Sequence, residues 1–420
     1  MSVSVSFPPK TLFLLLLFPK ERALGAMVNS AAAAGFDPKT FIFRSPRGEL
    51  TIPPDLTIPS FLFQTTSARA YHHRVAIADA SSRLSLTFSQ LRLRIGSAAR
   101  ALSYAGVSQG DVVLLLSPNS IHFPVLFFAI VSLGAVATTA NPVYTPREIE
   151  RQARDSRAKL IVAHPDLLPK LSSGLNLPIL VIDSDSSPGK SSPSHGPAVS
   201  YLSDAERLSA GHLPPPARIR QADTAVLLYS SGTTGPSKAV PLSHLNLIAS
   251  AIQTNSDAAR FSEMDLSFFV PIPFFHVYGL SVILFAQLQR GNTIVTTPRF
   301  DLVDMLKAIE EYHVTSLPLV PPIMLALAKH DVALKYDLSS VIEITSGAAP
   351  LGKETVEEVS KRFKIPDVRQ VRIRFRSPLF LYTKSVHTIL SLPSRLDHVC
   401  EVMMFLSSFS SNDMKIRVME

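Results

Sequence analysis

The chain has 420 residues, of which 46% are hydrophobic and 18% are charged, so it can bury the core of one large domain or of two smaller ones. Its formal net charge of +8 suits an anionic partner, but the basic residues are scattered and do not alternate with aromatic ones, which disfavours nucleic-acid binding. A single cysteine, Cys400, excludes an internal disulfide framework and a cysteine-rich zinc site.

Two apolar stretches resemble a targeting segment or a membrane-spanning segment. The first, Leu12 to Phe18, resembles a weak signal-peptide core, but Pro19 and the charged residues after it end the run at once. We therefore treat residues 1–26 as an appended leader without a fold of its own. The second, 123–140, approaches membrane-spanning length, but Gly134 divides it, so we expect a buried helix followed by a short strand and no transmembrane span.

Helical and strand-like patterns then alternate along the chain. Spacings of three and four between apolar residues predict helices, and short apolar runs predict strands. The helices are predicted at 87–104, 146–157, 304–312 and 353–363, and the strands at 112–116, 160–163, 223–229, 316–320 and 341–346. This alternation predicts an α/β fold with parallel-rich sheets flanked by helices, and the Ser-, Pro- and Gly-rich stretch 183–198 predicts an exposed loop.

A run of small hydroxyl residues and glycines, YSSGTTGPSKAV at 229–240, follows the third of these strands. Gly232 and Gly235 let successive backbone N–H groups converge on one anion, and Lys238 adds a positive charge. The Walker pattern of ATP-hydrolysing motors is absent, because the glycines are only three residues apart and Ala239 stands where that loop has Ser or Thr. We therefore predict a phosphate-binding loop of another kind, with a polar surface turn as the alternative.

Several ordered motifs together resemble the adenylate-forming acyl-activating enzymes, and within them the plant 4-coumarate-CoA ligase branch. Besides the loop SSGTTGPSK, they are GVSQGDVVLLLSPNS at 106–120, GAVATTANPVYTPREI at 134–149, PIPFFHVYGL at 271–280 and SGAAPLGKE at 346–354. The resemblance implies that residues 27–370 form the AMP-binding N-terminal domain of that family, in an incomplete form.

The same resemblance implies a two-step ligase reaction. A carboxylic acid, expected to be a phenylpropanoid or a fatty acid, attacks the α-phosphate of ATP to give an acyl-adenylate and pyrophosphate, and the thiol of CoA then takes the acyl group. Both steps develop negative charge on oxygen, so preorganised donors and Mg²⁺ are expected to supply most of the catalysis.

The resemblance also assigns residues to the nucleotide. The ATP phosphates are assigned to Ser230, Ser231, Gly232, Thr233, Thr234, Gly235 and Lys238. Gly347, Ala348 and Ala349 are assigned to the wall of the adenine and acyl pocket, although a plain strand-to-helix connection is the alternative for this segment. Gln370 is assigned to the same nucleotide site, and no protein ligand of a metal is assigned.

Three further residues are assigned to the acid and to CoA. His276 is expected beside the acyl carboxylate as the catalytic residue, acting by positioning; from the sequence alone, a histidine among apolar residues is more often packed in a core. Tyr278 is expected to contact the acyl group, together with Ala348. Arg299 is assigned to a CoA phosphate, with an ordinary surface arginine as the alternative.

The resemblance ends at Gln370. The family continues there with a Gly-Tyr-Gly-x-Thr-Glu segment, whereas this chain reads VRIRFRSPLFLYTKSVHTIL. We expect residues 371–420 to be an unrelated tail, disordered or produced by an incorrect gene model such as a retained intron, with the small C-terminal domain missing. Little or no ligase activity is then expected, and a non-catalytic nucleotide-binding isoform is the alternative. A cytoplasmic or peroxisomal location is expected, although the last three residues are not the peroxisomal Ser-Lys-Leu signal.

Overall fold

The computed structural model of the chain describes residues 50–66, 71–171, 174–182, 199–230, 237–256, 265–347, 349, 351–376 and 379–385, with short strands at 4–6, 36–37, 42–43 and 415–417. It divides into two units. The larger comprises Pro54–Arg372 with Lys384–Val386, and the other comprises Met1–Pro53, Ile373–Thr383 and His387–Glu420. The predicted loop at 183–198 and most of the predicted leader and tail lie outside the described residues.

In the smaller unit, the structure describes two short strand pairs. β1 (Ser4–Ser6) pairs in parallel with β19 (Lys415–Arg417), and β2 (Phe36–Asp37) pairs antiparallel with β3 (Ile42–Phe43).

The first sheet of the larger unit has seven strands in the order β10-β9-β8-β6-β7-β11-β12. Its neighbours pair in parallel except for β11 and β12, which are antiparallel. The bounds are β6 (Val112–Leu116), β7 (Val136–Ala140), β8 (Ala158–Ala163), β9 (Ile179–Val181), β10 (Val199–Tyr201), β11 (Thr224–Ser230) and β12 (Lys238–Ser243). The prediction of a parallel-rich sheet is confirmed, and the antiparallel return of β12 is a feature that the helix and strand pattern had not indicated.

The second sheet has eight strands in the order β18-β17-β16-β15-β13-β14-β4-β5. The pairs from β17 to β4 are parallel, and β5 pairs antiparallel with β4. The bounds are β4 (Val75–Asp79), β5 (Ser85–Thr87), β13 (Ser267–Val270), β14 (Thr293–Thr296), β15 (Ser316–Leu319), β16 (Glu343–Ser346), β17 (Asp367–Arg376) and β18 (Leu379–Ser385). The last four residues of β17 and most of β18 belong to the smaller unit.

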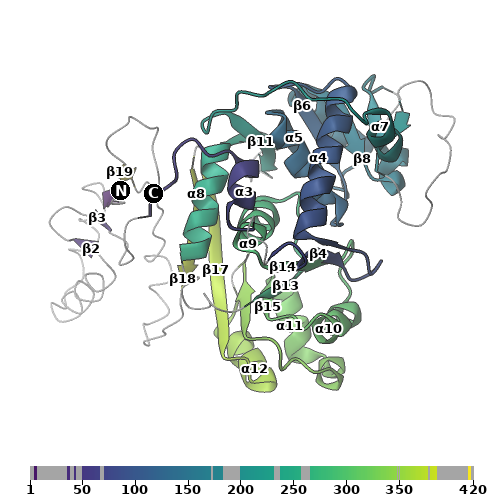
Figure 1. Ribbon diagram of the computed structural model, residues 1–420. Helices are drawn as coiled ribbons and strands as arrows, with labels where there is room; N and C mark the ends of the chain where they lie inside the picture. Colours follow the sequence, from purple (N-terminus) through teal and green to yellow (C-terminus); the bar gives the residue numbers. More distant parts are fainter. Residues whose placement is uncertain are drawn as a thin grey trace. The chain divides into compact units, whose positions relative to one another are not determined.

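Helices connect the parallel strands and cover both sheets (Figure 1). The α-helices are α3 (Ile58–Thr66), α4 (Phe88–Tyr104), α5 (His122–Ser132), α6 (Pro146–Asp155), α7 (Leu202–Leu208), α8 (His244–Asn255), α9 (Ala286–Arg290), α10 (Leu302–Glu311), α11 (Pro321–Lys329) and α12 (Lys353–Phe363). The described residues also form a π-helix, η4 (Tyr278–Phe285), which precedes α9, and two 3₁₀ turns, η2 (Pro165–Lys170) and η5 (Asp331–Lys335).

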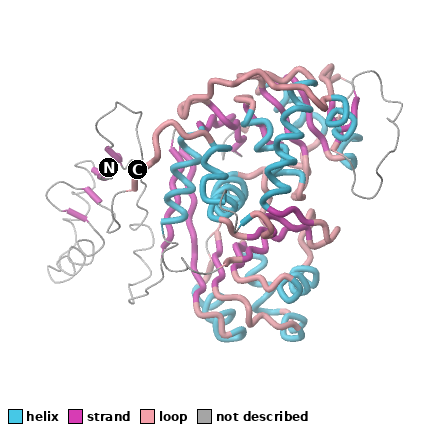
Figure 2. The backbone as a smooth tube through the Cα atoms, in the orientation of Figure 1, coloured by secondary structure: helices cyan, strands magenta, loops and turns pink. Residues whose placement is uncertain are grey.

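The helices α3, α4, α5, α8 and α9 form a layer between the two sheets, as the cyan segments of Figure 2 show. In this layer α5 contacts β6 and β7, α9 contacts β14, and α3 contacts α5, α8 and α9. Phe128 of α5 and Phe285 of η4 meet with ring centroids 6.0 Å apart. On the first sheet, α6 packs against β6, β7 and β8 in one apolar cluster. On the second sheet, α10, α11 and α12 share another apolar cluster with β13, β15 and β16 and lie on the side away from the central helices (Figure 1). The larger unit is therefore a stack of alternating helix and sheet layers.

Local sequence explains several of these helix boundaries. Thr87 caps α4 and Thr145 caps α6. The backbone N–H of each threonine donates in return to the side chain of Gln90 or Glu148, so the two helices begin where Thr-x-x-Gln and Thr-x-x-Glu stand. The apolar stretch at 123–140 folds as predicted into the buried helix α5 and the strand β7, joined at Gly134, which has φ +69°. Within the described part of the chain, no helix has the length and apolar character that a membrane crossing requires.

Candidate active site

The predicted phosphate-binding loop, residues 230–238 and called the phosphate loop below, connects two paired strands. Ser230 ends β11, Lys238 begins β12, and the two residues are direct partners across the antiparallel pair. The side chain of Lys238 is exposed. Residues 231–236, which include five of the residues assigned to the ATP phosphates, lie outside the described residues, so their role stays a prediction. The structure thus brings the two ends of the loop together.

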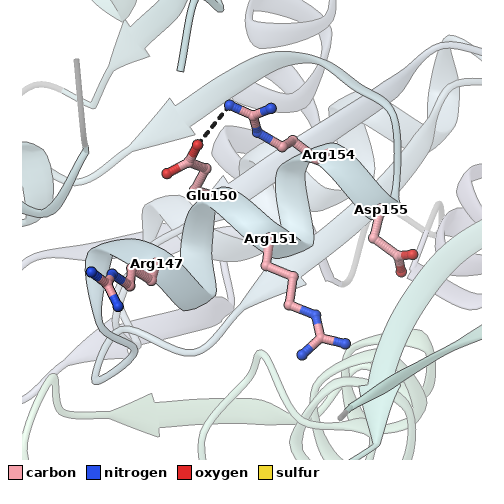
Figure 3. Close-up of a pocket in the computed structure, with 5 residues that line it drawn as sticks. All are labelled: Arg147, Glu150, Arg151, Arg154 and Asp155. Atoms are coloured by element: carbon pink, nitrogen blue, oxygen red, sulfur yellow. Dashed lines mark hydrogen bonds and ion pairs between the residues drawn. The ribbon is translucent and has the colours of Figure 1, made fainter. Parts of the chain in front are cut away.

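Tyr229 anchors the strand that leads into this loop. Its hydroxyl donates a 2.6 Å hydrogen bond to Asp155 Oδ2 at the end of α6, and burial together with that carboxylate raises the pKa of the phenol. Asp155 lies at one side of an open depression of about 690 Å³, shown in Figure 3. The depression is lined by Arg147, Glu150, Arg151, Arg154 and Asp155. Because all five belong to one helix and Arg154 pairs with Glu150 at 2.7 Å, we interpret it as a solvated helix face that supports β11.

His276 lies in the segment between β13 and the π-helix. Its side chain is exposed, so the packed-core alternative for this histidine is wrong. Its Nδ1 accepts a hydrogen bond from the backbone N–H of Tyr278 at 3.3 Å, which fixes the ring orientation. Protein atoms around the ring desolvate it in part and lower its pKa, so the neutral imidazole prevails at pH 7. A neutral ring with one nitrogen already engaged is suited to positioning.

Asn119, which the sequence analysis did not single out, holds the segment that carries His276. Its side-chain amide donates to the carbonyl of Ile272 at 3.0 Å and accepts from the N–H of Phe274 at 2.8 Å. Thr139 Oγ1 adds a 2.8 Å hydrogen bond to the carbonyl of Phe275. Asn119 follows β6 and Thr139 lies in β7, so the first sheet positions a loop that emerges from the second. The available sequence signal was a polar residue just after a buried apolar strand, where ligands of parallel sheets gather.

Tyr278 and Gly347 are in direct contact. A Cβ atom added at Gly347 would lie 3.1 Å from Cε1 of the Tyr278 ring, a tighter approach than side chains ordinarily make. The ring is 3% exposed, its hydroxyl is hydrogen-bonded to Thr345, and burial raises the pKa of the phenol to about 12. The structure therefore brings together two residues that the sequence analysis assigned to the acyl pocket.

The remaining assigned residues lie at the ends of neighbouring strands. Gly347 directly follows β16, and Gln370 in β17 is the register partner of Ser346, one residue earlier. The backbone N–H of Gly347 donates to the carbonyl of Leu319 at 3.0 Å, which fixes the start of the turn. Ala349 is exposed, and Ala348 lies outside the described residues.

Arg299 lies beyond the end of β14, with its side chain exposed and its carbonyl accepting a 2.8 Å hydrogen bond from Thr297 Oγ1. No described contact joins it to His276 or Tyr278. Its assignment to CoA therefore stays a prediction.

Three strand ends define one edge of the first sheet. β6, β7 and β11 run parallel, Asn119 follows β6, Thr139 is the penultimate residue of β7, and Ser230 ends β11. Thr139 thereby ties the His276 segment to the same edge at which the phosphate loop begins. Among the described residues, no group of three His, Cys, Asp or Glu side chains could hold a metal ion.

Comparison with known families gives one match over most of the chain. The sequence model of the family described as AMP-binding enzyme matches residues 64–371. A Humulus lupulus protein described as probable CoA ligase CCL5 is 41% identical over 351 residues, covering 82% of this chain and 63% of the relative. The Arabidopsis thaliana peroxisomal OPC-8:0-CoA ligase 1 is 38% identical over 356 residues, covering 82% of this chain and 62% of that protein. The chain thus spans about three fifths of the length of these relatives.

Solved structures agree on the fold. A natural red-emitting luciferase from Phrixothrix hirtus superposes with a TM-score of 0.66 at 28% identity, over 77% of this chain and 78% of that one. The anthranilate CoA ligase AuaEII, solved in complex with anthranoyl-AMP, has a TM-score of 0.66 at 24% identity, over 76% of this chain and 60% of that one.

Proposed function

We propose, from the premise that this chain belongs to the AMP-binding enzyme family, that its fold serves ATP-dependent activation of a carboxylic acid to an acyl-adenylate, followed by thioester formation with CoA. One observation carries this proposal: the hydrogen bonds of Asn119 and Thr139 hold the His276 segment at the sheet edge where the phosphate loop begins. An acid placed between these two features would have its carboxylate next to the α-phosphate of ATP, which is the arrangement that adenylation requires.

Each group then has a distinct part. The hydroxyl and N–H groups of the loop from Ser230 to Lys238 would bind the ATP phosphates, and the Lys238 ammonium would offset charge that builds up as pyrophosphate leaves. The neutral His276 ring would orient the attacking carboxylate by donating a hydrogen bond from Nε2, because its Nδ1 is already an acceptor. Mg²⁺, where present, would arrive with the ATP phosphates and neutralise part of their charge.

The acid is proposed to be a phenylpropanoid or a fatty acid. Tyr278 packs against Gly347 in the segment assigned to the acyl pocket, and the acids named for the relatives include 4-coumarate. We propose a cytoplasmic or peroxisomal location for this chain; the name of the Arabidopsis thaliana relative states a peroxisomal one for that protein.

A non-catalytic nucleotide-binding protein is the second candidate. The observation that favours it is that the family match covers residues 64–371 and not the residues after them. On this account the chain binds an acyl-adenylate but completes no turnover.

Two measurements on the purified chain test these proposals. Calorimetric titration with a non-hydrolysable acyl-adenylate, such as a 4-coumaroyl sulfamoyl adenosine, should show saturable binding. Pyrophosphate release from ATP, 4-coumarate and Mg²⁺ separates the two candidates: the ligase should release it above background, and the non-catalytic protein should not. Clear turnover would exclude the non-catalytic account, and an absence of any binding by ATP or the analogue would contradict both.

A further inference from the structure

Glu343 belongs to a row of residues on one face of β16. Side chains alternate across a strand, so Glu343, Thr345 and the position of Gly347 share one face, and Ile344 lies on the other. Ile344 belongs to the apolar cluster under α10, α11 and α12. Tyr278 contacts Gly347 and is hydrogen-bonded to Thr345. Glu343 is therefore the next side chain along the face that Tyr278 covers.

The carboxylate of Glu343 is buried and only half satisfied. The residue is 7% exposed, and its Oε1 accepts a 2.8 Å hydrogen bond from Ser316 Oγ. Its Oε2 is shielded from solvent and accepts no hydrogen bond from the described residues. A buried carboxylate oxygen without a donor is costly to the fold, so its presence calls for an explanation.

The charge of Glu343 reaches two neighbours across this face. It raises the pKa of the Tyr278 phenol and opposes the lowering of the Arg290 pKa that burial causes. The first effect agrees with the strand geometry, which places the carboxylate close to the ring that the acyl group is proposed to contact. A bound acid that extends past Tyr278, away from its own reacting carboxylate, would supply the donor that Glu343 Oε2 lacks.

We propose that Glu343 determines acid specificity, and that its Oε2 accepts a hydrogen bond from a hydroxyl group at the end of the acid remote from the reacting carboxylate. This inference rests on the ligase function proposed above. Gly347 and Glu343 are four residues apart, which is roughly 13 Å along a strand. An acid of matching length would contact Tyr278 along its body and Glu343 at its tip. An acid without the hydroxyl leaves Oε2 unpaired, and sites that lose such a buried hydrogen bond discriminate strongly.

The substitution Glu343→Gln provides a sharp test, because it keeps the volume and the Oε1 acceptor for Ser316 but turns Oε2 into an N–H donor. The probes are acyl sulfamoyl adenosines that differ only at the tip: 4-hydroxycinnamoyl against 4-methoxycinnamoyl, and 12-hydroxydodecanoyl against 12-methoxydodecanoyl. A hydroxyl can donate to Glu343, whereas a methoxy oxygen can only accept. The ratio of the two dissociation constants is compared between proteins, so the extra bulk of the methyl group cancels.

The wild-type chain should bind the hydroxyl member of one pair more tightly, and Glu343→Gln should change the ratio for that pair about tenfold in favour of the methoxy member. The pair that responds identifies a phenolic or an aliphatic hydroxyl. Glu357→Gln, which replaces an exposed carboxylate in α12, is the matched control and should leave both ratios of dissociation constants unchanged.

Equal ratios in wild type and Glu343→Gln for both pairs would overturn the inference. A second measurement needs no variant: wild type should bind 4-hydroxycinnamoyl or 12-hydroxydodecanoyl analogues more tightly than their unsubstituted counterparts, and equal affinities for both would also overturn it. Failure of every analogue to bind the wild type is a different outcome, since it contradicts the ligase proposal itself.

Discussion

Gly279 is the residue at which backbone space is tightest in the candidate site. A Cβ added there would overlap the carbonyl oxygen of Pro273, which belongs to the segment that carries His276. A backbone atom cannot move aside as a flexible side chain can, so the close approach of η4 to this segment depends on glycine. The sequence contained this glycine within PIPFFHVYGL, but its steric reason is visible only once the π-helix turns back onto Pro273.

We therefore expect Gly279→Ala to destabilise the chain by roughly 1–3 kcal/mol and to weaken binding of an acyl-adenylate analogue. The comparison is Gly96→Ala in α4, where an added Cβ would meet nothing closer than Arg100 Nη1 at 3.9 Å. Since alanine is the better helix former, Gly96→Ala should stabilise by about 0.5–1 kcal/mol. Urea unfolding followed by far-UV circular dichroism measures both, and equal midpoints for the two variants would contradict the steric account.

Candidate residues could be selected from the sequence only where an ordered motif carries them. His276, Tyr278 and Gly347 were selected in this way, and the last two are in contact, while their roles stay predictions. The role of Asn119 depends on partners more than 150 positions away in the chain, which no local pattern encodes. The unpaired Oε2 of Glu343 could not be predicted either, because strand pairing creates the surroundings of this carboxylate.

At the scale of elements, His244 joins the beginnings of two helices in the central layer. It is the first residue of α8, and its Nδ1 accepts a 3.1 Å hydrogen bond from the N–H of Ile58, the first residue of α3. The residue is 1% exposed, and burial lowers its pKa to about 4, against a partial opposing effect of Asp223. This hydrogen bond between α3 and α8 therefore requires a neutral imidazole ring.

Because the buried His244 ring is neutral in the fold, we expect the folded chain to lose stability in mild acid. In the unfolded chain His244 takes up a proton below about pH 6.5, whereas in the fold it stays neutral to about pH 4. The unfolded state therefore binds more protons between these values, so the free energy of unfolding falls as the pH falls, by roughly 3 kcal/mol in total. His244→Asn keeps an acceptor for Ile58 without a titrating ring, and should show a flatter dependence. Urea unfolding at intervals from pH 7 to pH 4 measures the two slopes; identical slopes would exclude His244 as the cause.

The positions of helices and strands could be predicted closely from the spacing of apolar residues, whereas the pairing of the strands could not. α4 begins at Phe88 and β6 spans Val112–Leu116, in agreement with the predicted 87–104 and 112–116, because apolar spacing and caps act locally. The antiparallel return of β12 and the π-helical form of Tyr278–Phe285 depend on tertiary packing. Apart from Ser281 the latter stretch has no polar residue but the tyrosine, and all eight residues are buried, so its sequence shows no preference for one face.

At the scale of the whole molecule, the two sheets cooperate through the loop between β13 and η4. Val270 ends a strand of the second sheet, while Thr139 of the first sheet and Asn119, which follows β6 of that sheet, hold the residues after it. A ligand held between this loop and the phosphate loop would contact both sheets at once. Its binding energy would then oppose global unfolding and not only a local opening.

This coupling predicts that ATP raises the melting temperature of the chain, and that Lys238→Ala reduces the increase without changing the melting temperature of the free protein. Lys238 is exposed in the absence of ligand, so its removal costs little there, whereas a lost charge-assisted contact to phosphate lowers affinity by about tenfold. At 100 times the dissociation constant, ATP would stabilise the wild type by about 2.7 kcal/mol. Differential scanning fluorimetry over a range of ATP concentrations measures the shift.

The control is Lys307→Ala, which removes another exposed lysine, in α10, and should respond to ATP as the wild type does. If ATP raised the melting temperature of Lys238→Ala as much as that of the wild type and of Lys307→Ala, Lys238 would not hold the nucleotide.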